Sequence, residues 1–172
     1  MLTGTLISWL RCSVAAAFVL SAVWKLRHRP EFASVIALVT PSAPPGVRRV
    51  LNWTVPAAEL AIATLLFLPF SFGRIGALAA CAFTVLTSVS LLRNDLSAGC
   101  GCWGSGTTLS RGALLVRNAV LVALSALSLV GTPATGLTVL LFCVPAGTLL
   151  ALIVLDMPNV VQYLRNSAEV GS

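Results

Sequence analysis

The chain has 172 residues, of which 58% are hydrophobic and 9% are charged, and its mean hydropathy is +0.97. Soluble domains carry about a quarter charged residues, so this composition excludes a water-soluble globular domain and indicates a protein embedded in lipid. The formal net charge is +6, but the basic residues are scattered and are not interleaved with aromatic ones. This pattern argues against nucleic-acid binding and leaves membrane orientation as the role of the charge.

Five apolar segments approach the length of about 20 residues that crosses the hydrocarbon layer. In chain order they cover residues 5–24, 53–70, 75–92, 113–130 and 136–155. Each is expected to be an α-helix, because unpaired backbone groups are costly in lipid. The predicted fold is therefore an all-α, polytopic transmembrane bundle of four core helices and a fifth, C-terminal helix. It forms one domain over residues 1–157, followed by a polar tail at 158–172.

The N-terminal segment is interpreted as a retained helix. No basic region precedes its apolar run, and no small-residue cleavage site follows it, so it does not have the pattern of a signal peptide.

Two connections between the predicted helices are long. Residues 25–52 contain a short apolar stretch at 32–39 and a proline-rich run at 41–46, which predict a short interfacial helix followed by a stiff turn. Residues 93–112 contain the sequence Cys-Gly-Cys. Two membrane crossings separate these connections, so both are expected on the same side of the membrane.

Three ionisable residues are predicted to meet at this side. At a rise of 1.5 Å per residue, Glu59 lies about 9 Å and Arg117 about 6 Å below the membrane face, with Lys25 at its rim. A lone carboxylate at that depth is costly, so Glu59 requires a cation, and Lys25 and Arg117 are available. The cluster either serves a function or only pins helices together, and the two alternatives stay open. Arg11, about 20 Å deeper, is expected to snorkel toward the opposite interface.

Cys100 and Cys102 are the candidate catalytic residues. A disulfide between them needs a sharply bent backbone, which the intervening glycine permits, and a strained, exposed disulfide is easily reduced. The nearby Arg93, Arg111 and Arg117 would favour a reactive thiolate. We therefore expect a redox-active dithiol in preference to an inert pair in a turn. A metal site is also disfavoured, because it would need further ligands, and no metal is predicted.

The other cysteines and the neighbouring tryptophan have simpler explanations. Cys12, Cys81 and Cys143 lie inside apolar helices and are expected to be small packing residues, with a relay of thiols within the membrane as the less favoured alternative. Trp103 either anchors its loop at the interface or shapes a docking surface.

Four short motifs follow one another in the sequence: AVWKL at 22–26 with PEF at 30–32, VPAAEL at 55–60, CGCWG at 100–104 and VRN at 116–118. In this order they resemble the MauE branch of the DoxX-like integral membrane proteins, over roughly residues 8–130. The resemblance implies thiol–disulfide chemistry with a thioredoxin-like partner, directed at the small subunit of methylamine dehydrogenase, and implies that chemistry more firmly than methylamine metabolism. Trp103 stands where the family usually has phenylalanine.

We expect a membrane protein that exchanges disulfides through Cys100 and Cys102 with a thioredoxin-fold or other thiol protein. Residues that support the pair are then Lys25, Glu59, Trp103, Arg117 and Asn118. The main alternative is a non-enzymatic scaffold, or a subunit of a larger membrane complex, with a static Cys pair. A third alternative is a quinone-linked carrier built on the charged cluster. No cofactor is predicted, with a quinone as the less favoured possibility.

The orientation of the cysteine loop is predicted from opposing arguments. Eight of the eleven basic residues belong to its face, which by the positive-inside tendency places that face in the cytoplasm. Disulfides persist in oxidising compartments, which places it outside the cell membrane. The second argument, supported by the family role, is preferred, so the loop is expected to be extracytoplasmic.

Overall fold

The protein is described by a computed structural model that covers residues 2–68, 71–93, 111–130, 141, 143–154 and 156. These residues form helices, without a strand among them. In chain order the helices are α1 (Leu2–Arg27), α2 (Arg29–Val39), α3 (Pro45–Phe67), α4 (Ser71–Arg93) and α5 (Arg111–Leu127). A further apolar helix, Cys143–Val154, follows. The prediction of an all-α fold is therefore confirmed for the described residues.

Within the described residues, three helices are long and apolar enough to cross a membrane: Gly4–Arg27, Pro45–Phe67 and Phe72–Arg93. Two shorter apolar helices cover Leu114–Leu127 and Cys143–Val154. These helices fit a multi-pass membrane protein. The count of four core helices plus a fifth stays a prediction, as does the expected span 136–155, of which residues 136–140, 142 and 155 lie outside the described part of the chain.

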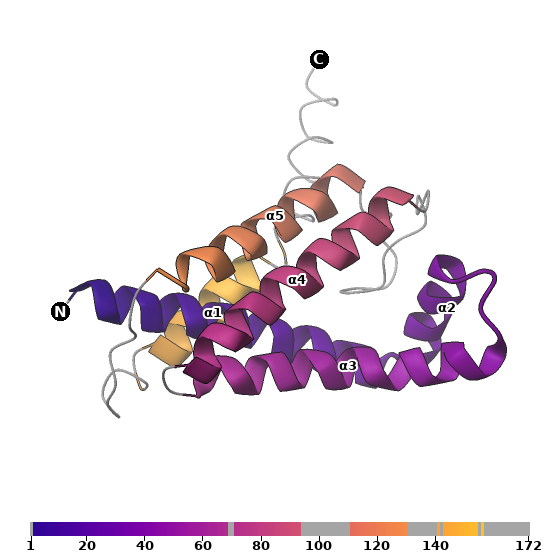
Figure 1. The fold of residues 1–172 in the computed structure, drawn as a ribbon, viewed down its shortest axis with the longest axis horizontal. Helices are drawn as coiled ribbons and strands as arrows, with labels where there is room; N and C mark the ends of the chain where they lie inside the picture. The colour runs from indigo at the N-terminus through magenta and orange to yellow at the C-terminus, as the bar shows by residue number, and fades with distance from the viewer. Residues whose placement is uncertain are drawn as a thin grey trace, which may run out of the picture.

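The helices α1, α3, α4 and α5 alternate in direction, as Figure 1 shows. α1 packs against α3 and α5, and α4 lies between α3 and α5. The Cys143–Val154 helix runs beside α1, with Cys143 next to Thr5 and Ala151 packed with Ala17. The end of α1, the start of α3, the end of α4 and the start of α5 therefore gather at one end of the bundle (Figure 1). This is the arrangement that counting membrane crossings predicts.

α3 begins at Pro45, eight residues before the expected start at Trp53. A proline suits the first turn of a helix, because its backbone angle is already helical and its missing N–H needs no partner there. The predicted turn at 41–46 is correspondingly shorter. α3 ends at Phe67, and Leu68 is extended, as expected for a residue that precedes a proline. The predicted short helix at 32–39 is confirmed within α2.

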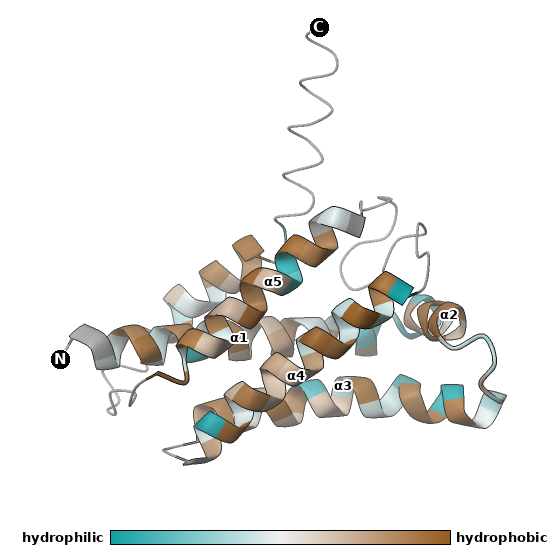
Figure 2. Cartoon of the chain, turned by 45° about the horizontal axis from the view of Figure 1, so that its top comes forward, coloured by the Kyte–Doolittle hydropathy of each residue, from teal (hydrophilic) through white to brown (hydrophobic). Residues whose placement is uncertain are grey.

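Apolar residues, half of them alanines, form the core between the long helices. It contains Val14, Ala15, Phe18, Ile62, Ala63, Leu66, Ala77 and Ala80. Several of these are alanines, which allow helix backbones to approach closely, as is common where helices pack in lipid. Large apolar side chains such as Leu78 and Leu86 instead point outward, and Figure 2 shows hydrophobic residues along the outer sides of α4 and α5. Lipid is the solvent that accommodates such a surface.

Candidate functional site

A buried ion pair joins the C-terminal part of α1 to the middle of α3. The Nζ atom of Lys25 donates to Oε1 of Glu59, and the two residues are only 5% and 3% exposed. Ser21, one turn before Lys25, donates to the same Oε1 at 3.1 Å and accepts from Nζ at 3.1 Å. A buried charge is tolerated when it is paired and hydrogen-bonded. The pair therefore fixes α1 against α3.

Lys25 is not at the rim of the bundle, where the sequence placed it. Helix α2 folds back near the end of α1, and the ring of Phe32 lies 5.5 Å from Nζ of Lys25. Phe32 is itself buried. Because α3 starts early, about 21 Å of helix separates Pro45 from Glu59. The first turns of α3 therefore extend beyond the ion pair, and α2 packs against α3.

A cavity of about 340 Å³ lies beside this ion pair. Its wall is largely apolar and comes from α1, α2, α3, α4 and α5. The polar and charged residues on the wall are Ser21, Lys25, Thr40, Glu59, Thr84, Thr87, Ser90, Arg117 and Asn118. The three ionisable residues that the sequence predicted to meet thus share one cavity.

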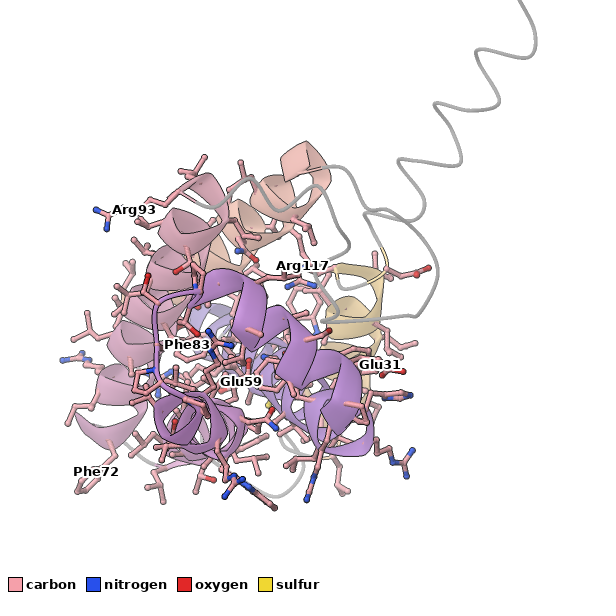
Figure 3. All side chains as sticks on the ribbon, turned by 90° about the vertical axis from the view of Figure 1, so that its right-hand side faces the viewer. Glu31, Glu59, Phe72, Phe83, Arg93 and Arg117 are labelled. Atoms are coloured by element: carbon pink, nitrogen blue, oxygen red, sulfur yellow. The ribbon has the colours of Figure 1, made fainter. Side chains whose placement is uncertain are left out.

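Arg117 contributes the second cation of the cavity wall. Its side chain is half-buried, and Figure 3, which looks onto this end of the bundle, shows Arg117 and Glu59 within the ring of helices and Arg93 at the periphery. Within the described residues, the buried Nε of Arg117 has no hydrogen-bond acceptor. This N–H group is therefore available to a ligand.

Asn118 joins α5 to α4. It is 4% exposed, and its Nδ2 donates to Oγ of Ser88 at 3.0 Å, which in turn donates to the carbonyl of Thr84 at 2.8 Å. This chain of hydrogen bonds satisfies the buried amide. Asn118 thus positions the neighbouring Arg117 on the cavity wall.

Cys100, Cys102 and Trp103 lie outside the described residues. The helix ends that flank their segment are described. α4 ends at Arg93 and α5 begins at Arg111, and both ends lie at the cavity end of the bundle (Figure 1). Leu91 and Leu114, close to those two ends, pack together with Val39 of α2 and also line the cavity. The segment with the two cysteines is therefore attached at both ends beside the cavity.

The membrane-buried cysteines lie at helix contacts. Cys81 lies 3.7 Å from the carbonyl of Val122, and Cys143 lies 3.9 Å from the carbonyl of Thr5. Cys12 faces Gly147 of the last helix. All three are free thiols, and these positions fit the predicted packing role. Among the described residues no three His, Cys, Asp or Glu side chains gather as metal ligands.

Arg11 does not snorkel to an interface as the sequence suggested. It is 4% exposed, and its Nη2 donates to the carbonyl of Ser128 at 3.4 Å, just after the end of α5. Gly73 leaves room for the guanidinium, which a side chain at that position would meet. In the sequence, Arg11 was detectable only as an arginine within an apolar run. The role of Ser21 at the cavity end was detectable only through its spacing of four from Lys25.

Comparison with known proteins gives two matches. The family model described as "Methylamine utilisation protein MauE" matches residues 3–131. The "Methylamine utilization protein MauE" of Paracoccus denitrificans is 34% identical over 129 residues, which cover 73% of this chain and 69% of the relative. No solved structure matches the chain.

Proposed function

The chain belongs to the MauE family, and from that premise we propose that it is a membrane protein that exchanges disulfides with a thiol partner through Cys100 and Cys102. The observation that carries the proposal is the attachment of the Cys-Gly-Cys segment. Its flanking residues, Arg93 and Arg111, lie at the end of the bundle that holds the buried Lys25–Glu59 pair. The two cysteines are thereby carried between two helix ends that lie at the same end of the bundle as a buried, hydrogen-bonded ion pair.

The exchange follows ordinary thiol–disulfide chemistry. A thiolate of the reduced partner attacks one sulfur of the Cys100–Cys102 disulfide, and a mixed disulfide forms as the other cysteine leaves as a thiolate. The second thiol of the partner then attacks the mixed disulfide. The partner loses two electrons and two protons and gains a disulfide, and Cys100 and Cys102 end as two thiols.

The charged residues are assigned supporting roles in this scheme. Lys25 and Glu59 hold α1, α2 and α3 together, and Arg117 places a positive charge at the end of the bundle where α4 ends and α5 begins. A cation near a cysteine favours its thiolate form. Asn118 holds the helix of Arg117 against α4, and Trp103 next to the pair offers an aromatic contact to a docking protein.

A thioredoxin-fold protein is the proposed partner, at the extracytoplasmic face of the cell membrane, where disulfides persist. The relative from Paracoccus denitrificans is named for methylamine utilisation. We propose that the disulfides exchanged by the present chain likewise serve methylamine utilisation.

Replacement of Cys102 by serine is expected to trap a mixed disulfide formed in the reverse direction of this exchange. Cys100 can still attack the disulfide of the oxidised partner, and Cys102 is no longer present to release that partner. The measurement is a non-reducing gel of membranes expressing Cys102→Ser with a partner captured through Cys100, followed by identification of that partner. Cys81→Ser is the matched control and should leave exchange intact, since Cys81 lies at a contact between α4 and α5. Undiminished partner oxidation by a Cys100→Ser/Cys102→Ser protein would instead support a scaffold with a static pair.

A further inference from the structure

We infer that the cavity between α1 and α5 binds a lipophilic quinone, which takes the electrons from the reduced Cys100–Cys102 pair; this redox role rests on the proposed function. The cavity of about 340 Å³ falls in the range of sites for small molecules, which are mostly apolar with a few polar groups. Its wall comes from helices that carry an apolar outer surface (Figure 2). A lipid-soluble molecule is therefore the class of ligand that can reach and fill it.

The open hydrogen-bonding capacity of the wall favours a carbonyl oxygen. Lys25 is already engaged by Glu59 and Ser21. Among the described residues that line the cavity, the buried side-chain donor without an acceptor is Nε of Arg117. This buried donor suits an uncharged carbonyl oxygen, such as the one at either end of a quinone, in a wall that is otherwise largely apolar.

The charge of the wall favours the reduced form of such a ligand. Lys25, Arg117 and Glu59 leave a formal charge of +1 on the described wall. A cationic ligand is thereby disfavoured, whereas negative charge that develops on a quinone oxygen during reduction is stabilised next to Arg117. Arg117 is then a residue that binds the quinone and promotes its reduction.

The position of the cavity links oxidation of the thiol partner to reduction of the quinone. Leu91 and Leu114 line the cavity and lie near the ends of α4 and α5 that flank the cysteine segment. In the inferred step, two S–H bonds of Cys100 and Cys102 break and one S–S bond forms. The quinone accepts the two electrons and two protons, and two O–H bonds of the quinol form. The pair is thereby ready for another cycle of partner oxidation.

Binding is tested first without redox chemistry. The probe is decylubiquinone, titrated into the purified full-length Cys100→Ser/Cys102→Ser protein in lipid nanodiscs. We expect saturable binding that Arg117→Gln weakens by about tenfold, the factor of one hydrogen bond to a charged group. Arg93→Gln is the matched control, since Arg93 is exposed at the periphery of the same end (Figure 3), and it should leave the affinity unchanged.

A second pair of variants keeps the test decisive if Arg117→Gln does not fold. Val55→Phe places a larger side chain on the cavity wall and should weaken binding, whereas Val50→Phe enlarges an exposed residue of the same helix and should not. Absence of saturable quinone binding overturns the inference. So does displacement of the quinone by oleate at lower concentration than by a second quinone, which would identify a site for anionic amphiphiles.

Turnover separates this inference from the proposed function. With a reduced dithiol partner and decylubiquinone, the wild-type protein should produce quinol, detected by its ultraviolet absorbance, and Arg117→Gln should slow this production. If the protein oxidises the partner with another oxidant but binds no quinone, the inference fails and the proposed function stands. If quinone binds but the protein does not pass electrons from a reduced dithiol partner to it, the electron-transfer step of the inference fails and only the binding site remains. Capture of a partner by Cys102→Ser then decides the proposed function separately.

Discussion

At the scale of single residues, the most consequential feature is the buried pair of Lys25 and Glu59. Two buried ions stabilise a fold only when each satisfies the other, because removal from water is costly for both. Here Ser21 and the ring of Phe32 add to the pairing. The same residues form one wall of the cavity. Loss of one partner should therefore cost far more stability than loss of both.

Glu59→Gln is expected to lower the free energy of unfolding by about 3–5 kcal/mol, because Lys25 is left buried without its counter-ion. The double variant Lys25→Met/Glu59→Leu should recover most of that loss. The measurement is the unfolding of the purified protein in sodium dodecyl sulfate. Glu31→Gln, at an exposed position of α2, is the control and should change stability by less than about 0.5 kcal/mol. Equal losses in the single and double variants would contradict a coupled pair.

At the scale of elements, small residues determine how closely the helices approach. Gly76 of α4 lies against the backbone of α3: a Cβ atom at this position would lie 2.8 Å from the backbone nitrogen of Leu66 and 2.9 Å from the carbonyl carbon of Leu65. Backbone atoms cannot rotate away, so α3 and α4 would have to separate. Gly147 stands in the same relation to Ser13 of α1. These contacts hold the cavity wall together from its far end.

Gly76→Ala is expected to destabilise the protein by about 1–3 kcal/mol, the usual cost of overpacking a tight contact. Thermal unfolding of the purified protein in detergent would measure it. Gly112→Ala is the matched control in α5, where nothing lies within 4 Å of an added Cβ atom, and alanine there should be neutral or slightly stabilising. A Gly76→Ala protein as stable as Gly112→Ala would show that α3 and α4 do not pack as closely as described.

At the scale of the whole molecule, the bundle has one end that is rich in basic residues. Several of these have structural contacts. Arg29 lies over the ring of Trp53 at 4.0 Å, Arg48 donates to the carbonyl of Pro41 at 2.6 Å, and Lys25 belongs to the ion pair. Basic residues retained for such contacts carry less information on orientation than the positive-inside tendency assumes. The proposed extracytoplasmic placement of the cavity end is therefore compatible with their number.

A cysteine-free protein with Val50→Cys is expected to react with a membrane-impermeant maleimide in intact cells, because Val50 is 59% exposed near the start of α3 at the cavity end. Phe72→Cys, 54% exposed at the start of α4 at the other end, should react only after lysis. Gel-shift of the labelled protein measures both. The reverse pattern would place the cavity end in the cytoplasm and would replace the proposed partner by a cytosolic thiol protein.

Much of this architecture could be predicted from the amino-acid order. Apolar length identified the long helices and the lipid medium, since lipid forces helical backbone pairing wherever a segment crosses it. Alternation of direction then brought Lys25, Glu59 and Arg117 to one end, because direction follows from counting crossings alone. Helix boundaries were predicted less accurately. α3 starts at Pro45 and not at residue 53, because a proline-rich run is compatible with a stiff turn and also with the start of a helix.

Only the tertiary structure decided which charges pair and what surrounds them. The rotation of each helix and its distance from its neighbours depend on close contacts of residues such as Gly76. If one helix were rotated about its axis, Glu59 would face a residue other than Lys25. The fold-back of α2 buries Lys25 under Phe32, and the contact of Arg11 with Ser128 joins residues 117 positions apart. The cavity exists because five helices meet at these rotations. Its position follows from long-range packing, which no local pattern in the sequence records.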